Sequence, residues 1–191
     1  GREAKATFMP TLPIVVRLDG RGFSKFTKPF DRPFDQRMAN SMRRTTSRLV
    51  KESHARIGYT QSDEITLIFQ DHGYGTQGMA RQMEGCTPHF DARVWQVPSR
   101  SEATNSLLWR AQDARKNGIS SACRSLNSAK SMHHKNQNDM VQMIAQKGVD
   151  YYETFAQGDR LGTYWQRQNF TELLDDATWE AIPESVRNVQ S

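Results

Sequence analysis

The sequence has little of what builds a disulfide scaffold, a zinc ribbon or a membrane protein. Its only cysteines, Cys86 and Cys123, lie far apart and form no Cys-x-x-Cys pair. This argues against a disulfide framework or a zinc ribbon and is typical of a reducing compartment. No apolar run approaches the roughly 20 residues that span a bilayer. There is no charged start followed by an apolar stretch and a cleavage site, so we expect no secretory signal, no membrane contact and a cytoplasmic location.

Hydrophobic residues are also scarce. Only 36% of the 191 residues are hydrophobic and 25% are charged, and the mean hydropathy is −0.77. The length suits one domain, or one domain with an appendage. We therefore expect a lean core and a surface that serves a polar partner.

Positive charge is present in excess and is unevenly placed. The formal net charge is +5, yet residues 171–191 carry −4, which leaves +9 on the first 170 residues. Residues 17–56 alone hold eleven basic and four acidic side chains. Such a segment is typical of a protein that binds a polyanion, although a solvated helix face explains the same run.

Hydrophobic periodicity and turn residues predict alternating strands and helices. The expected strands are 14–18, 58–60, 65–69, 90–97 and 162–165, and the expected helices are 35–54, a weak one at 77–84, 101–126 and 137–146. We expect the helix at 101–126 to begin at Ser101, which can cap it. The inward face of the 35–54 helix is predicted to be Met38, Met42, Thr45, Leu49 and Ser53, and Trp95, Trp109 and Trp165 are expected to be packing residues.

The order strand, helix, strand, strand, weak helix, strand is that of a ferredoxin-like βαββαβ fold. It predicts an α+β domain with an antiparallel sheet, helices on one face of it and additional C-terminal helices.

Two acidic turns are the main candidates for chemistry. Asp19 follows the first strand, and Asp63 lies at the tip of the hairpin between the second and third. In a split βαβ sheet these strands are central and adjacent, so both carboxylates can converge on one edge. Carboxylates and a backbone carbonyl are ligands that Mg²⁺ prefers, and two such ions promote phosphoryl transfer. The alternative is that Asp19-Gly20 is an ordinary turn and Asp63 an exposed hairpin residue.

A resemblance to a known family adds to this interpretation. The stretch Val15 to Phe26, followed by Gln61-Ser62-Asp63-Glu64, resembles the tRNA-histidine guanylyltransferase family, polymerases that add nucleotides to RNA in the 3′-to-5′ direction. Further matches are Phe90-Asp91-Ala92-Arg93, Trp109-Arg110 and Arg160-x-Gly162-Thr163. The resemblance runs from about residue 13 to 167.

The resemblance implies a palm-like catalytic domain of the polymerase and cyclase type that binds two Mg²⁺ ions. Asp19 and Asp63 would be carboxylate ligands, Gly20 a carbonyl ligand and Glu64 a supporting catalytic acid. The nucleotide would be lined by Asp19, Gly20, Arg21, Gly22, Phe23, Ser24, Ser62 and Asp63. Contacts to phosphate or RNA are expected from Arg17, Lys25, Arg32, Arg93, Arg110, Lys130 and Lys135. The domain would then comprise a core at 1–100, a helical extension with a late strand at 101–170 and an acidic tail at 171–191.

The family reaction activates a 5′-monophosphate with ATP or uses a 5′-triphosphate, and the 3′-hydroxyl of an incoming nucleotide attacks that end. The implied partners are tRNA, GTP, ATP and other nucleoside triphosphates, with assembly into a homo-dimer or tetramer.

Departures from the family pattern favour one of its branches. The guanylyltransferases proper carry a His-Ile-Asn-Asn-Leu-Tyr-Asn motif where this chain has Arg115 to Ser121. That sequence resembles the guanylyltransferase-like branch, which repairs 5′-truncated tRNA by templated addition. Non-templated addition to histidine tRNA is the alternative. Ser24 stands where many relatives have a histidine, and Arg32-Pro33-Phe34-Asp35 differs from the eukaryotic Lys-Pro-Asn-Asp.

Relatives also place a long helical segment between the hairpin and Phe90, where this chain has about twenty residues. Two other classes remain open: a non-catalytic RNA-binding protein, which needs neither acid, and a nucleotidyl cyclase on the same palm, which does not explain the basic segment.

Overall fold

A five-stranded antiparallel sheet forms the centre of the molecule. The computed structural model describes residues 8–9, 11–70 and 90–168. The strands are β1 (Ile14–Gly20), β2 (Ile57–Gln61), β3 (Glu64–Phe69), β4 (Phe90–Gln96) and β5 (Thr163–Gln166), in the order β4-β1-β3-β2-β5. The first four strands have the predicted ferredoxin-like order, and the predicted late strand adds to the β2 edge.

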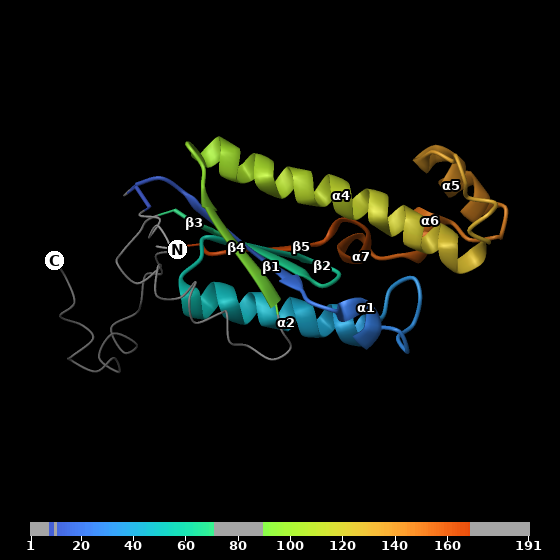
Figure 1. Cartoon of the computed structure of the whole chain (residues 1–191), viewed down its shortest axis with the longest axis horizontal. Coiled ribbons are helices and arrows are strands. Elements are labelled where there is room, and N and C mark those ends of the chain that lie inside the picture. Colours follow the sequence, from blue (N-terminus) through green and yellow to red (C-terminus); the bar gives the residue numbers. More distant parts are fainter. Residues whose placement is uncertain (1–7, 10, 71–89, 169–191) are drawn as a thin grey trace, which may run out of the picture.

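The helix α2 (Gln36–Ser53) covers one face of the sheet (Figure 1). Asp35 caps it by accepting hydrogen bonds from the backbone N–H groups of Arg37 and Met38. Its buried residues are Met42, Thr46, Val50 and Ser53. The prediction that Thr45 points inward was wrong, because the four-residue steps from Met42 lead to Thr46 and leave Thr45 exposed.

The helix α4 (Arg100–Leu126) lies on the opposite face of the sheet (Figure 1). It packs Ala103 and Leu107 against Val15 and Ile68. The prediction that the helices share one face was therefore incomplete, because β1 presents apolar side chains to both sides and each side needs a cover. The expected helix at 77–84 lies outside the described residues. The cap of α4 is Ser99, whose hydroxyl accepts from the Glu102 N–H, not Ser101.

The far end of α4 belongs to a small helical arm with α5 (Gln137–Ala145) and α6 (Tyr151–Thr154) (Figure 1). The arm has its own hydrophobic cluster, which includes Ile119, Cys123, Met132, Ile144 and Tyr151. From there α7 (Gln157–Leu161) leads back to β5. The sheet and the arm thus have separate cores joined by one long helix.

Two of the three tryptophans predicted to pack do so. Trp95 packs against the α4-side cluster and Trp165 against the α2-side cluster. Trp109 on α4 is 74% exposed, so the prediction was wrong for this residue. Among the described helices, none combines the length and the apolar character that crossing a membrane requires.

Candidate active site

The fold brings the two predicted acids to the same edge of the sheet. Asp19 lies at the end of β1, directly opposite Glu64 on β3. Asp63 lies in the two-residue loop that joins β2 to β3, preceded by Ser62 in a left-handed conformation (φ 55°). The N–H of Gly20 donates to the carbonyl of Asp63 at 3.1 Å, which ties the two turns together. Asp19 and Asp63 line one cavity, so the predicted convergence is confirmed.

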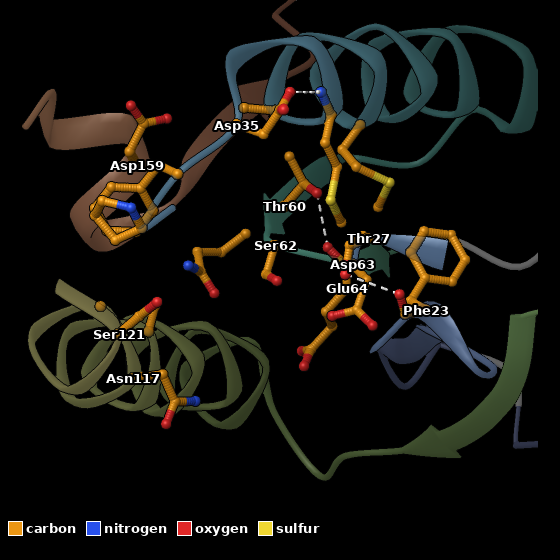
Figure 2. Close-up of a pocket in the computed structure, with 18 of the residues that line it drawn as sticks. Phe23, Thr27, Asp35, Thr60, Ser62, Asp63, Glu64, Asn117, Ser121 and Asp159 are labelled. Atoms are coloured by element: carbon orange, nitrogen blue, oxygen red, sulfur yellow. Dashed lines mark hydrogen bonds between the residues drawn. The ribbon is translucent and has the colours of Figure 1, made fainter. Parts of the chain in front are cut away.

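This cavity has a volume of about 510 Å³ and lies between the sheet edge, the loop before α2, and α4 and α7. Figure 2 shows Asp63 and Glu64 at one end, Asn117 and Ser121 on the α4 wall, and Asp159 farther away. Its lining contains seven carboxylates and four arginines: Asp19, Asp31, Asp35, Asp63, Glu64, Asp113 and Asp159, with Arg17, Arg32, Arg43 and Arg110.

The arginines do not leave this cavity ready for an anion. Arg17, Arg43 and Arg110 are each paired with carboxylates of the same lining. Carboxylates outnumber arginines, so a triphosphate would meet net repulsion unless cations entered with it. The cavity favours a cation or a cation-bound polyanion.

Asp63 is the carboxylate that most needs a counter-charge. Burial raises its pKa above the usual value of 3.8, and the negative charge of Asp19 raises it further. Hydrogen bonds from its own backbone and from Ser62, together with the charge of Arg17, oppose this shift. The influence of Asp19 on Asp63 shows that the two carboxylates share one electrostatic environment.

Glu64 holds a different position from the other two acids. Its side chain is only 10% exposed and receives Arg110 through two hydrogen bonds of 2.6 Å. Arg17 also contacts it, at 2.8 Å, and bridges to Asp19 at 2.9 Å. Arg110 also forms an ion pair of 3.1 Å with Asp113 on the same helix. Glu64 therefore fastens α4 to the sheet beside the cavity, as a supporting acid would.

The loop after Asp19 is shaped by two glycines. A Cβ at Gly20 would lie 2.4 Å from the ring of Phe23, and Gly22 has a φ of 71°, a left-handed conformation that favours glycine. Phe23 begins the short helix α1 (Phe23–Phe26) and packs against Phe90. Phe23 thus anchors this loop, from which Asp19, Phe23 and Ser24 line the cavity, whereas Gly20, Arg21 and Gly22 do not.

The structure does not gather all predicted phosphate contacts at the cavity. Lys25 and Arg32 are exposed on the segment that precedes α2, and Arg32 reaches the cavity lining. Arg93 is exposed on β4 opposite Arg17. Lys130 and Lys135 lie on the arm, where Lys135 and Arg115 line a second, open groove.

Sequence reasoning missed the far end of the cavity. Asp159 on α7 is 6% exposed, pairs with Arg43 and accepts a hydrogen bond from Gln36 at 2.7 Å. Arg43 and Asp159 are separated by 116 residues. No local motif marks the pair, and only the three-dimensional fold brings it to the site.

The residues present fit a divalent cation at the near end. Within 8–9, 11–70 and 90–168, no group of three or more His, Cys, Asp or Glu side chains is arranged to hold a metal ion. Asp19, Asp63 and the carbonyl of Gly20 offer the hard oxygen atoms that Mg²⁺ takes alongside water and substrate phosphates. The raised pKa of Asp63 shows the uncompensated negative charge that such an ion would balance.

The sheet order and the paired acids at its edge define a palm-like α+β domain. Solved structures agree. A bacterial tRNA(His) guanylyltransferase-like protein in complex with ATP superposes with a TM-score of 0.76 at 24% identity, covering 86% of this chain and 83% of that one. The tRNA(His) guanylyltransferase of Saccharomyces cerevisiae superposes with a TM-score of 0.67 at 18% identity, covering 95% and 97%.

Sequence comparisons also find similar proteins. The family model for tRNA(His) guanylyltransferase matches residues 2–77. An uncharacterized protein of Acanthamoeba polyphaga mimivirus is 28% identical over 193 residues, 74% of this chain and 66% of its own length. The probable tRNA(His) guanylyltransferase of Drosophila melanogaster is 24% identical over 143 residues, 61% of this chain and 50% of its own length. The chain is thus similar to proteins of the tRNA(His) guanylyltransferase family and spans half to two thirds of the length of these relatives.

Proposed function

We propose that this protein is a nucleotidyltransferase that adds nucleotides to the 5′ end of tRNA in the 3′-to-5′ direction. One observation carries the proposal: Asp19 and Asp63 share one end of a carboxylate-rich cavity, where the N–H of Gly20 donates to the carbonyl of Asp63. The match of residues 2–77 to the family model supports the same chemistry. So do the neighbouring structures, because bacterial relatives of this fold are in complex with ATP and with GTP.

Asp19, Asp63 and the Gly20 carbonyl would hold two Mg²⁺ ions, which when bound neutralise triphosphate charge and stabilise the attacking and leaving oxygens. The chain's own groups do the rest. The Gly20 N–H already donates to the Asp63 carbonyl, so the backbone N–H groups that follow it, from Arg21 to Ser24, would approach the triphosphate. Ser62 limits the protonation of Asp63, and Glu64 keeps Arg110 and α4 in place.

In the proposed reaction the acceptor end is first activated with ATP, or already carries a triphosphate. The 3′-hydroxyl of the incoming nucleotide then attacks the 5′ phosphorus, and AMP or pyrophosphate leaves. Templated repair is proposed over addition to histidine tRNA because Arg115 to Ser121 on α4 departs from the motif of the guanylyltransferases proper and resembles the guanylyltransferase-like branch.

The arm supplies a surface for RNA. Residues 115–147 contain six Lys or Arg and one Asp, and that aspartate, Asp139, accepts a hydrogen bond from the N–H of Asn136, the N-cap of α5. In the described part of the chain, none of these six basic side chains forms an ion pair; they are Arg115, Lys116, Arg124, Lys130, Lys135 and Lys147. We infer that they contact RNA phosphates, because basic side chains that neutralise phosphates release the counterions condensed on the RNA.

A primer-extension assay tests the proposal. Protein, Mg²⁺, ATP and a tRNA lacking its 5′ nucleotide should yield extension by the base that pairs with the opposing strand, and Asp63→Ala should lower the rate about 100-fold or more. Glu153→Ala removes an exposed carboxylate on the arm and should leave the rate unchanged. Intact histidine tRNA in the same assay reports non-templated addition.

RNA binding separates the enzyme from the alternatives. Asp63→Ala should bind tRNA as tightly as wild type, whereas Lys130→Glu with Lys135→Glu should weaken binding about 10-fold and reduce its salt dependence. A wild type that binds tRNA but incorporates none of the four nucleotides would be an RNA-binding protein. Cyclic nucleotide made without RNA would instead show a cyclase.

A further inference from the structure

Arg17 occupies an unusual position between two acids. Val15 on β1 faces the α4 side of the sheet, so alternation places Arg17 and Asp19 on that side too. A single nitrogen of Arg17, Nη2, donates to Asp19 Oδ2 at 2.9 Å and forms an ion pair with Glu64 Oε2 at 2.8 Å. The Nε of the same side chain is buried without a hydrogen-bond partner. Arg17 therefore contacts both Asp19 and Glu64 through Nη2 alone, and its Nε donates no hydrogen bond.

Arg110 shows what a firm pair looks like at the same site. It contacts both oxygens of Glu64 through separate nitrogens, each at 2.6 Å. Glu64 is thus already balanced in the bidentate geometry that makes arginine–carboxylate pairs strong. The contact of Arg17 with Asp19, by contrast, is made by one nitrogen to a side chain that is 47% exposed, the kind of pair that contributes little free energy.

We propose that Arg17 takes the place of a divalent ion on Asp19 in the ion-free protein and releases Asp19 when the ion binds. The inference rests on the proposed function, because it takes Asp19 and Asp63 as the ligands. Arg17 keeps Glu64 after the exchange, and its released donors then serve a phosphate oxygen. The guanidinium acts as a positioning residue that holds Asp19 in place and sets the affinity of the site for its ion.

The sign of the effect on ion affinity is the distinctive consequence. A cation beside a ligand weakens the attraction of that ligand for a second cation. Removing Arg17 should therefore strengthen ion binding, whereas loss of a merely structural side chain would weaken it or leave it unchanged.

Calorimetric titration of the full chain with Mn²⁺, in the absence of nucleotide and RNA, tests this directly. Arg17→Met keeps an unbranched side chain without charge and should bind Mn²⁺ about 2- to 5-fold tighter than wild type, the range expected for losing one partly exposed ion pair. The matched control is Arg44→Met, which removes an exposed arginine outside the cavity lining and should leave the affinity unchanged.

Equal or weaker binding by Arg17→Met would overturn the inference while leaving the metal site itself standing. Absence of Mn²⁺ binding by both proteins would instead contradict the proposed ligands, and the inference with them. Should Arg17→Met fold poorly, Arg17→Gln keeps a donor for Glu64, and thermal unfolding replaces calorimetry. The rise in melting temperature on adding Mn²⁺ should then be larger for Arg17→Gln than for wild type, and an equal or smaller rise would count against the inference.

Discussion

Asp63 is a proposed ligand of the divalent ion, so its protonation changes the affinity of this cavity for a cation. Burial and the neighbouring charge of Asp19 raise its pKa above 3.8. An ordinary aspartate would be ionised throughout mildly acidic pH, whereas Asp63 takes up its proton at a higher pH. Affinity for divalent ions should therefore begin to fall at a higher pH than an unperturbed carboxylate would give.

The same shift predicts an effect on stability. Because the folded-state pKa is raised, the ionised form of Asp63 is less stable in the folded protein, and stability declines as the pH rises through the interval above 3.8. Asp63→Asn removes that charge and should raise the melting temperature of the ion-free protein at pH 8 by about 2 °C.

The gain from Asp63→Asn should fade below about pH 4, where an unfolded aspartate is also protonated. Thermal unfolding in a chelator at both values of pH checks this, with wild type as the reference. A variant less stable than wild type at pH 8 would mean that the Asp63 charge is compensated within the fold.

Individual residues also show the reach of sequence reasoning. Asp19 and Asp63 could be predicted because each follows or joins strands whose order the pattern already indicated. Arg43 and Asp159 could not, because their contact depends on how α7 returns to α2 across 116 residues. The exposure of Trp109 likewise depends on which side of α4 meets the sheet.

A cluster of charges joins the helix α4 to the sheet beside the cavity. Glu64 contacts Arg110 on α4 and Arg17 on β1, and its side chain is 10% exposed. Removing the acid leaves two partly buried guanidinium groups without their main partner. Glu64→Ala should therefore lower the free energy of unfolding by about 2 kcal/mol, below the full cost of a buried pair because both arginines keep some solvent contact.

Chemical denaturation of Glu64→Ala, Arg110→Ala and the double variant measures this contact. We expect a coupling energy of at least about 1 kcal/mol between the two residues. Glu102→Ala, which changes an exposed acid near the start of α4, serves as the control. Additive losses would show that Glu64 does not fasten α4 to the sheet.

Strands and helices were predictable to the extent that their signals are local. The β-branched run at β1, the hairpin of β2 and β3 and the capped, glycine-free α2 all follow from short stretches of sequence. The face that α4 covers does not, because docking depends on which apolar sheet positions remain uncovered. The choice of Ser99 over Ser101 as its cap shows the same limit at a boundary, since either serine can accept the first-turn N–H.

The molecule as a whole separates its charges. The chain carries +5, yet the cavity beside Asp19 and Asp63 is lined by seven carboxylates and four arginines. The basic run at 17–56 is divided in the fold: Arg17 and Arg43 turn to the cavity, and Arg48 pairs with Glu52 on the helix surface. Composition predicts a polyanion partner, but only the fold shows that carboxylates outnumber arginines around this cavity.

The central claim is that Asp19 and Asp63 coordinate the same divalent ions. A crystal structure of the protein with Mn²⁺ and a non-hydrolysable nucleoside triphosphate, with anomalous scattering recorded for manganese, tests it most directly. We predict an anomalous peak that marks manganese coordinated by both carboxylates and by the triphosphate, with the contact between Asp19 and Arg17 broken. Bound nucleotide without manganese at these acids, or manganese held elsewhere, would contradict the account.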